Sequence, residues 1–535
     1  MLFEITATDL LGRNGIIHTK KGTIRTPCFV PVVHPESSKN LLVVSEFQTK
    51  YAVDFIITSS YILKNRYADA KIDLHKQTGF LGPIMTDSGA YQSLVYGEIE
   101  FTPESVIAYQ EGIGSDFGVP LDIPIAINDS YEIAKTKVEE TISRCKKVPA
   151  TIAKTDTIWV GPIQGGRYLD LLEKSSQAVS DADSFGMFAL GSVVELMSDY
   201  QYDTLVDMIL TVKQHLDPGK PLHLFGAGHP SMFPLIVAAG CDSFDSAAYA
   251  LYAHELRYMT TTQTFLLEEL DDFPCSCPVC LSTTPMELLK RPKGEIHSAL
   301  ASHNLFVCQT EMKNIRRAIS MGTLWELLES RSLAHPNLKK GFDRLKEQSH
   351  LLVNSTPSIK KKGIFVVSDD SLKRPEILSH KERIAKIASP SSKNLIVISL
   401  LHADLEEVYG LFKSVKSFLK RHVTVAKEFD IWVLDPVFGL YPLEISEVFP
   451  LAQYVAIDTL SRVNIHSIVR SSLTKLIEFQ LDSLFLIGSL TDINEVEKEH
   501  LILGKTALDI KSFSFTIDDS SLSKIIFILD QLFGQ

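Results

Sequence analysis

The sequence has few cysteines and no long hydrophobic run. Seven cysteines occur in 535 residues, which excludes the disulfide scaffold of a small secreted domain. The longest apolar stretch, residues 395–401, is far shorter than the roughly 20 residues that a membrane-spanning helix needs. The first residues lack the basic segment and the apolar segment of a secretory signal. We therefore expect a cytoplasmic protein with no membrane partner.

The sequence also has fewer basic than acidic side chains. The 53 basic side chains face 65 acidic ones, and the formal net charge is −12. This balance argues against broad, non-specific binding of nucleic acid, because such binding depends on neutralising phosphates. Local basic segments remain candidates for phosphate contacts, although a charge run is more often a solvated face. They are Lys20–Arg25, Lys290–Lys293, Arg316–Arg317 and Lys360–Lys362.

One pattern recurs eight times between about residues 26 and 250. A short apolar run ends in Gly, Ser, Asp or Gln, and a helix-length amphipathic stretch usually follows. This alternation predicts an α/β fold, the (β/α)₈ TIM barrel, with a doubly wound open sheet as the alternative. The runs are Thr26–Val33, Asp54–Ser60, Pro83–Gly89, Gly118–Pro124, Trp159–Gly166, Met187–Val194, Pro221–Gly228 and Cys241–Ala247.

Polar residues and glycine close several of these runs. Asp87, Asp122, Gln164, Gly191 and Asp245 all stand near the carboxyl end of a predicted strand. In a barrel these ends converge on one mouth, where barrel enzymes place their chemistry, whereas an open sheet would spread them along an edge. The pattern therefore favours the barrel.

The barrel pattern ends well before the chain does. Residues 251–350 are mostly helical by pattern, and the polar, Lys-rich segment 354–363 breaks the periodicity. Beyond it, apolar runs again alternate with helical stretches. We expect a barrel domain over 1–350 with a zinc-binding subdomain at about 270–310, a smaller α/β accessory domain over 358–480, and a third small unit over 481–535.

Three of the cysteines fall within six positions. Cys275, Cys277 and Cys280, followed by His303, supply three thiolates and one imidazole. This is a complete tetrahedral shell for one structural Zn²⁺ per chain, with no position left for a reactive water. The alternative is a reduced cysteine cluster beside an unrelated core histidine, and His297 competes with His303 as the fourth ligand.

Two acids stand at strand ends far apart in the sequence. Asp87 lies in Thr-Asp-Ser-Gly and Asp245 in Phe-Asp-Ser-Ala. A pair of carboxylates around one sugar is what glycosidic chemistry needs, one as nucleophile and one as acid/base. The ordinary alternative is that each aspartate caps a helix or forms a turn.

Several ordered motifs resemble a known family. MTDSGAYQ (85–92), PLDIP (120–124), PIQGG (162–166), HLFGAGHP (223–230), CDSFDSAAYALYA (241–253) and PCSCPVC (274–280) with His303 occur in sequence. They resemble the tRNA-guanine transglycosylase family, specifically the archaeal branch that makes the precursor of archaeosine. The similarity covers about residues 1–345 and continues weakly through 373–377 and 435–454, which look like that branch's accessory domain.

The resemblance implies a base exchange in tRNA. Guanine 15 of the D-arm would be flipped out of its stack, Asp245 would attack C1′ of its ribose, and Asp87 would act as general acid/base. The incoming base would be 7-cyano-7-deazaguanine, which displaces the enzyme from the ribose. Two alternatives stay open, an archaeosine-synthase-like paralogue and a non-catalytic RNA-binding subunit. The presence of Asp87 and Asp245 argues against both.

The resemblance also implies a base pocket. Asp122 would accept from N1–H and the exocyclic amine, Gln164 and the backbone of Gly191 would address O6, and Tyr91 and Phe225 would sandwich the ring. The segment Ser192-Val193-Val194 would form an apolar wall for the nitrile. Considered singly, these residues would be better explained as a helix cap, a surface amide, a turn and core aromatics, and only the ordered set of motifs favours the binding roles.

The chain departs from the branch's pattern in three ways. Ser192 replaces a usual glycine and Glu195 a usual proline, so a cationic incoming base stays an alternative. The C-terminal stretch shows no RNA-binding PUA pattern, and we expect the chain either to lack that module or to receive it from a separate PUA-domain protein. The family further implies a homodimer, to which the zinc region contributes.

Overall fold

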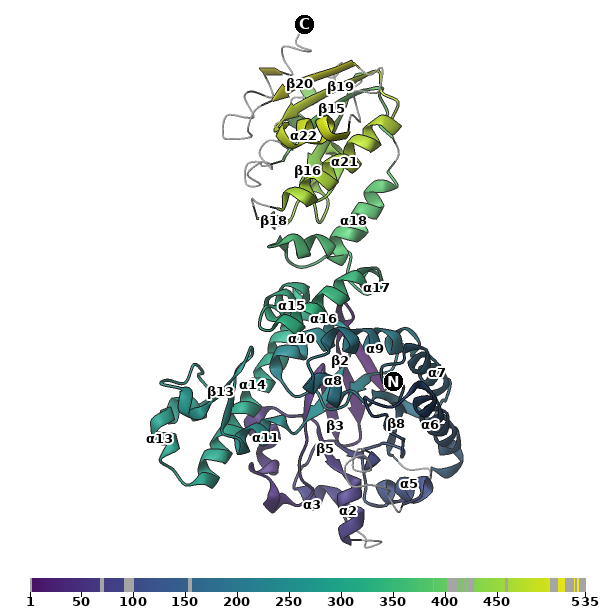
Figure 1. The fold of residues 1–535 in the computed structure, drawn as a ribbon, viewed down its shortest axis with the longest axis vertical. Coiled ribbons are helices and arrows are strands. Elements are labelled where there is room, and N and C mark those ends of the chain that lie inside the picture. Colours follow the sequence, from purple (N-terminus) through teal and green to yellow (C-terminus); the bar gives the residue numbers. More distant parts are fainter. Residues whose placement is uncertain are drawn as a thin grey trace. The chain divides into compact units, whose positions relative to one another are not determined.

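The structure is a computed structural model whose chain divides into two compact units, Met1–Gln348 and Ser349–Gln535. Figure 1 shows the elements of both units. The residues that the structure describes are 2–67, 72–90, 101–152, 156–387, 389–401, 412–413, 415–417, 419–421, 428–457, 460–500, 509–514, 524 and 527–528.

The first unit is a closed barrel of eight parallel strands. The strand order is β4-β11-β10-β9-β8-β7-β6-β5, and every neighbouring pair is parallel. A parallel bridge between Val32 and Ile57 joins the two ends, which confirms the TIM barrel over the open sheet. The strands are β4 (Cys28–Pro31), β5 (Ile56–Ser59), β6 (Ile84–Asp87), β7 (Phe117–Gly118), β8 (Ile158–Ile163), β9 (Phe185–Leu190), β10 (Leu222–Leu224) and β11 (Ser243–Ser246).

Strand β7 ends earlier than the apolar run at 118–124 suggests. Pro120 and Pro124 have no N–H to donate to a ladder, so the chain after Gly118 leaves the sheet. The side chain of Gln110 replaces the missing ladder bonds: its Oε1 accepts from Val119 N–H at 3.0 Å and its Nε2 donates to Val119 O at 2.9 Å. The residues after β7 are thereby free to line the mouth of the barrel as a loop.

A small sheet covers the opposite end of the barrel. Strands β1 (Phe3–Asp9), β2 (Gly12–Thr19) and β3 (Gly22–Thr26) pair antiparallel. Phe3, Ile17 and Ile24 belong to one buried apolar cluster with interior barrel residues such as Met85 and Val160. This end is therefore sealed, and the carboxyl ends of the strands form the accessible mouth.

Helices surround the barrel. The excess of apolar residues on one face of each helix is buried against the strands, as for α9, whose Leu205, Ile209 and Val212 are fully buried. The helices are α1 (Phe47–Tyr51), α2 (Ser60–Tyr67), α3 (Leu74–Thr78), α5 (Pro103–Gly112), α6 (Tyr131–Thr151), α7 (Leu169–Ser180), α8 (Val194–Ser198), α9 (Tyr202–Gln214), α10 (Phe233–Ala238) and α11 (Ala248–His254).

The cysteine cluster lies in an excursion after the last barrel strand. The hairpin β12 (Arg257–Met259) and β13 (Thr264–Leu266) leads to α12 (Pro278–Ser282) and α13 (Pro285–Leu289). The 29-residue helix α14 (Lys293–Met321) then returns to the barrel, followed by α15 (Leu324–Ser332) and α16 (Pro336–Glu347). In this excursion α14 contacts α12 and β12, and Figure 1 labels β13, α13 and α14.

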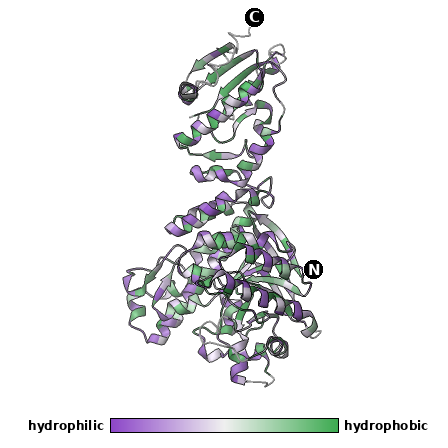
Figure 2. Ribbon diagram, turned by 45° about the vertical axis from the view of Figure 1, so that its right-hand side comes forward, coloured by the Kyte–Doolittle hydropathy of each residue, from purple (hydrophilic) through white to green (hydrophobic). Residues whose placement is uncertain are grey.

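The second unit is an α/β layer around a five-stranded sheet of order β17-β16-β15-β19-β20. Only its edge strand β17 is antiparallel. The central strands are continuous apolar runs, as expected for parallel strands buried on both faces, and Figure 2 shows them largely in the hydrophobic colour. The strands are β15 (Asn394–Ser399), β16 (Asp430–Asp435), β17 (Gly439–Pro442), β19 (Ser483–Gly488) and β20 (Asp509–Ser514).

Two further features complete the second unit. A separate parallel pair, β14 (Ile364–Val366) and β18 (Tyr454–Ala456), lies outside the main sheet. The helices are α17 (Ser349–Val353), α18 (Pro375–Ala385), α21 (Arg462–Glu478) and α22 (Thr491–His500). In the part of the chain that the structure describes, no helix combines the length and the apolar character needed to cross a membrane.

Candidate active site

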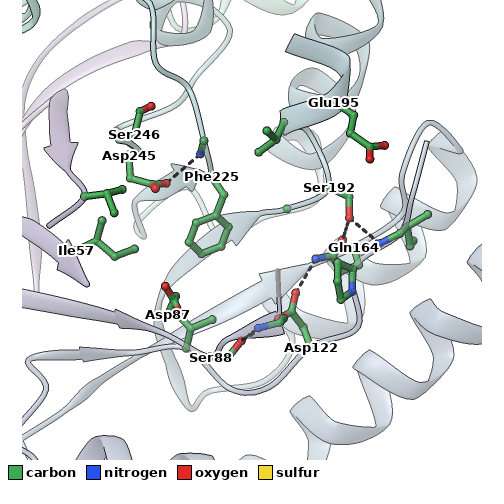
Figure 3. Close-up of a pocket in the computed structure, with 18 of the residues that line it drawn as sticks. Ile57, Asp87, Ser88, Asp122, Gln164, Ser192, Glu195, Phe225, Asp245 and Ser246 are labelled. Carbon is green, nitrogen blue, oxygen red and sulfur yellow. Dashed lines mark hydrogen bonds between the residues drawn. The ribbon is translucent and has the colours of Figure 1, made fainter. Parts of the chain in front are cut away.

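A cavity of about 360 Å³ opens at the mouth of the barrel. It gathers predicted residues from six different strand ends, and Figure 3 shows Asp87, Phe225 and Asp245 turned toward one space. Val193, which is fully buried at the start of α8, does not line it. Tyr91 lies outside the described residues. The predicted residues that line the cavity are Asp87, Asp122, Gln164, Gly191, Ser192, Val194, Phe225 and Asp245.

Asp87 ends strand β6 and is held by two donors. Its Oδ1 accepts from Ser59 Oγ at 3.1 Å and from Gly89 N–H at 2.9 Å. Gly89 has a φ of +84°, and a Cβ there would lie 2.5 Å from the Cβ of Tyr61, so the turn needs glycine. The loop is thereby fixed in the conformation that presents the Asp87 carboxyl group to the cavity.

The environment of Asp87 favours its protonated form. Burial raises the pKa of the Asp87 carboxyl to about 7, and the negative charges of Asp245 and Asp122 act in the same direction. The hydrogen bonds from Gly89 and Ser59 oppose this rise without cancelling it. A carboxyl group with a pKa near neutrality can give a proton to a leaving group and take one back.

Asp245 is the last but one residue of strand β11, which is separated from β6 by β4 and β5 in the closed barrel. Its Oδ1 lies 3.1 Å from His223 Nε2 and accepts from Gly226 N–H at 3.0 Å. Among the described residues, no hydrogen bond involves Oδ2 of Asp245. The carboxylate is therefore anchored through one oxygen, and the other can act as a nucleophile.

His223 was not among the residues expected from the sequence. It lies on β10, its side chain is fully buried inside the barrel, and its Nδ1 lies 2.9 Å from Ser243 Oγ. The sequence contained a signal for this residue. Successive strand residues point to opposite faces, so His223, between Leu222 and Leu224, takes an inward position. Ser88, which donates to Asp122 Oδ1 at 3.2 Å, was missed as well.

Three polar side chains form a hydrogen-bonded row along another wall. Gln164 Nε2 donates to Asp122 Oδ2 at 2.6 Å, and Ser192 Oγ donates to Gln164 Oε1 at 2.6 Å. Burial raises the pKa of Asp122, while its bonds from Gln164 and Ser88 lower it. A Cβ on Gly191 would lie 2.4 Å from Gln164 Nε2, so only glycine allows this close approach. The row offers both acceptors and donors to a planar ligand, and Figure 3 draws it with dashed lines.

The remaining lining is largely apolar. Phe225 projects into the cavity (Figure 3), and its ring makes an edge-to-face contact with His223 at a centroid distance of 4.9 Å. Val32, Ile57 and Val194 add aliphatic surface. An aromatic face next to a polar row suits a flat heterocycle with hydrogen-bonding edges.

The four predicted metal ligands come together. The ligand atoms of Cys275, Cys277, Cys280 and His303 all lie within 4.8 Å of one another. Cys277 Sγ is 3.5 Å from Cys280 Sγ, close to the roughly 3.8 Å edge of a zinc–thiolate tetrahedron. His303 Nδ1 lies 3.3 Å from Cys280 Sγ, and its Nε2 is bound to Met259 O at 2.8 Å.

This donor set fits zinc. A carbonyl that holds the second ring nitrogen of a ligating histidine is a usual outer contact of a zinc site. Tyr258 stacks on the His303 ring at 3.7 Å, and its hydroxyl lies 3.4 Å from Cys280 Sγ. His297 instead contacts His254, with 3.2 Å between their Nδ1 atoms. The alternative fourth ligand, His297, is thereby excluded from the cluster that the described residues form.

The basic segments are partly used inside the protein. Lys360 forms a buried ion pair with Glu376, and Arg316 donates to Pro27 O at 2.8 Å. Arg25 is paired with Asp54 at 3.0 Å. These contacts give one basic residue in each of three segments a partner inside the protein, whereas Lys290–Lys293 is exposed.

Comparison with known proteins gives a consistent picture. A family model described as "Queuine tRNA-ribosyltransferase" matches residues 9–337. A protein of Saccharolobus solfataricus named "tRNA-guanine(15) transglycosylase" is 40% identical over 461 residues, which are 85% of this chain and 90% of that protein. A protein of Methanocaldococcus jannaschii with the same name is 39% identical over 468 residues, 85% of this chain and 68% of that protein.

Proposed function

Because the chain belongs to the tRNA-guanine transglycosylase family, we propose that it replaces guanine 15 in the D-arm of tRNA with 7-cyano-7-deazaguanine. This exchange is a step of archaeosine biosynthesis. Members of this family are pentosyltransferases that exchange guanine in tRNA. The observation that carries the proposal is the pairing of a protonatable Asp87 with an anchored Asp245 across one cavity that also holds the Asp122–Gln164 row.

The chemistry is a double displacement. Asp245 Oδ2 attacks C1′ of the ribose, the bond from C1′ to guanine breaks, and Asp87 gives its proton to the departing base. The incoming base then attacks C1′ while Asp87 takes up its proton, and the bond from Asp245 to C1′ breaks. No external energy source is needed, because one glycosyl bond replaces another.

The cavity supports recognition of guanine and its 7-deaza analogue. The Asp122 carboxylate accepts from N1–H and the exocyclic amine, while Gln164 Nε2 donates to O6, which lies against the backbone of Gly191. Phe225 stacks on one face of the ring, and Tyr91 takes the other face. A flipped guanosine is required, because C1′ is otherwise shielded within the stack.

The metal and the partners follow from the same family membership. Cys275, Cys277, Cys280 and His303 hold one Zn²⁺, which fastens the segment after β13 to α14 and takes no part in the reaction. The proposed partners are tRNA, a second copy of the chain that contacts the zinc region, and a separate PUA-domain protein that adds phosphate contacts. The proposed location is the cytoplasm, where the tRNA substrate is found.

Exchange of labelled guanine into a tRNA transcript with guanine at position 15 tests the proposal. Wild-type protein incorporates the label, Asp245→Ala incorporates none, and Asp199→Ala behaves as wild type, because Asp199 is an exposed residue at the end of α8. Asp87→Asn slows exchange strongly. Mass spectrometry of a wild-type reaction quenched in acid detects the covalent adduct between protein and tRNA.

Absence of exchange by zinc-loaded wild-type protein, alone and with a PUA-domain protein added, contradicts the proposal. In that case retained binding of the transcript would identify the chain as a non-catalytic RNA-binding subunit. Exchange by Asp245→Ala at the wild-type rate would contradict the assigned nucleophile while leaving the reaction itself in place.

A further inference from the structure

Ser192, in the turn after β9, and Glu195, in the first turn of α8, bind the loop that follows β7. Ser192 Oγ accepts from Ile125 N–H at 2.8 Å, and Glu195 Oε2 accepts from Ile127 N–H at 2.9 Å. The intervening Ala126 gives its N–H to Asp129 Oδ2 at 2.9 Å. Alternate amides of this loop therefore face the turn, and side chains hold the loop as a neighbouring strand would.

The held loop forms one wall of the cavity. Asp122, Pro124 and Ile125 all line the cavity, together with Ser192 and Glu195 themselves. Pro120 and Pro124 cannot donate backbone hydrogen bonds, so this segment has fewer backbone contacts than a strand would have. The position of the Asp122 carboxylate thus depends on the side chains that bind its loop.

Ser192 also sets the orientation of the Gln164 amide. A hydroxyl group has one hydrogen to donate, and because Ser192 accepts from Ile125 N–H, this hydrogen is available for Gln164 Oε1 at 2.6 Å. The amide nitrogen is then turned toward Asp122 Oδ2 at 2.6 Å, where the carboxylate accepts from it. With the amide turned the other way, Gln164 Oε1 would face the Asp122 carboxylate, so that two acceptors would meet. Gln164 Nε2 would then face the Ser192 hydroxyl hydrogen, so that two donors would meet.

The backbone of Ser192 is in a conformation that its hydrogen bonds explain. Its φ is +59°, in the left-handed region that favours glycine. Ser192 adopts this conformation although it is not glycine, and its hydroxyl bonds two partners that lie 28 and 67 residues away along the chain. Strain of this kind persists where the surrounding structure holds the residue.

We infer that Ser192 and Glu195 are positioning residues, which hold the 122–127 loop and the Gln164 amide in the geometry that binds the base. Ser192 acts through Gln164 and Ile125, and Glu195 acts through Ile127 as a hydrogen-bond acceptor. Glu195 is thus bound to the backbone and does not serve as the counter-ion of a cationic incoming base. This inference rests on the proposed function and names further determinants of the same site.

Guanine exchange kinetics of the full chain test the inference. Ser192→Ala and Glu195→Ala each raise KM for guanine about tenfold and leave kcat within about threefold, because Asp87 and Asp245 lie on other strands. Glu195→Gln keeps an acceptor for Ile127 N–H without the charge, and its KM returns to within about threefold of wild type. Ser198→Ala, an exposed serine on the same helix, is the matched control.

A double-mutant cycle separates positioning from direct contact. If Ser192 acts through Gln164, Ser192→Ala raises KM less than threefold when it is introduced into Gln164→Ala. A full tenfold rise in that background overturns the role assigned to Ser192. The role assigned to Glu195 is overturned if Glu195→Gln behaves like Glu195→Ala. It is also overturned if Glu195→Gln loses exchange of an aminomethyl-substituted 7-deazaguanine.

Failure of the inference is distinguishable from failure of the proposed function. Wild-type exchange with unchanged KM in both alanine variants contradicts the inference alone. If wild-type protein shows no exchange, calorimetric titration of guanine into the protein supplies the readout. Binding weakened about tenfold by Ser192→Ala then supports the inference, and equal binding by wild type and variant overturns it. Thermal melts confirm that each variant is folded.

Discussion

His223 and Asp245 form a buried pair at the carboxyl ends of two adjacent barrel strands. His223 Nε2 lies 3.1 Å from Asp245 Oδ1, and Ser243 Oγ lies 2.9 Å from the other ring nitrogen. Parallel pairing of β10 with β11 places His223 opposite Ser243, two residues before Asp245. The sheet register therefore determines where the carboxylate points.

Removal of this imidazole is expected to slow the reaction more than it weakens tRNA binding. In His223→Ala, Asp245 keeps only the bond from Gly226 N–H among the described residues and becomes free to rotate away from C1′. Misplacement of a reacting group by about 1 Å can cost about 100-fold in rate. We expect kcat to fall about 100-fold and KM for tRNA to change less than threefold in the guanine exchange assay.

The matched control is His18→Ala. His18 is exposed on β2, at the sealed end of the barrel, and its loss leaves exchange unchanged. A folded His223→Ala protein with wild-type kcat would show that Asp245 needs no support from this side chain.

Activity is expected to fall above neutral pH. Asp87 has a pKa of about 7, mainly because it is buried, and its protonated form is the one that protonates the departing guanine. The free-enzyme value of kcat/KM for tRNA therefore declines about tenfold per pH unit once the pH exceeds about 7. Initial rates between pH 5.5 and 9 measure this limb, and a flat profile would refute the acid role of Asp87.

The raised pKa of Asp87 also makes the free energy of unfolding depend on pH. Between its ordinary pKa near 4 and the folded value of about 7, the folded state binds the Asp87 proton and the unfolded state does not. The free energy of unfolding therefore falls as the pH rises through this window. Asp87→Asn removes this contribution, so its urea midpoint exceeds that of wild type at pH 8 but not at pH 4.

Asp122 is expected to control affinity for the base. Asp122→Asn replaces an acceptor-only carboxylate by an amide and disturbs the bonds from Gln164 and Ser88. We expect KM for guanine to rise about 50-fold, since a hydrogen bond to a charged group contributes about 1.5–3 kcal/mol. An Asn variant that binds guanine as wild type does, by calorimetry, would show that another group accepts from the base.

Loss of the metal site is expected to weaken the fold without changing the reacting groups. Cys277→Ser removes a thiolate ligand, and bound zinc falls from one per chain to near zero by elemental analysis. We expect Tm to drop by about 10 °C, because the ion cross-links the segment after β13 to α14. Cys145→Ala changes a buried cysteine in α6 and leaves the zinc content unchanged. Full zinc retention in Cys277→Ser would place the ion elsewhere.

Much of the first unit could be predicted from local pattern. Each of the eight apolar runs contains or overlaps a barrel strand, because a buried parallel strand needs a short continuous apolar segment. The one displaced strand, β7, shows the limit of this reasoning. Apolar character alone extended it to Pro124, whereas two prolines and the Gln110 side chain direct the chain out of the sheet.

Residue types and their spacing also indicated where the functional sites lie. Cys275, Cys277 and Cys280 indicated a metal site by their spacing, and four ligand atoms do gather there. The resemblance placed Asp87, Asp122 and Asp245 in one site, and they line one cavity. Val193 shows what a motif cannot resolve, since it is fully buried and does not line the cavity, whereas its neighbours Ser192 and Val194 do.

The sequence by itself determined the order of strands and helices, the metal-ligand spacing and the chemistry available at the strand ends. These depend on residue type and on separations of a few positions. Only the tertiary structure decided that His223 anchors Asp245, that burial keeps Asp87 protonatable, and that Ser192 and Glu195 hold a loop more than 60 residues earlier. Desolvation and hydrogen bonding between distant segments exist only once the barrel has closed, so no local pattern encodes them.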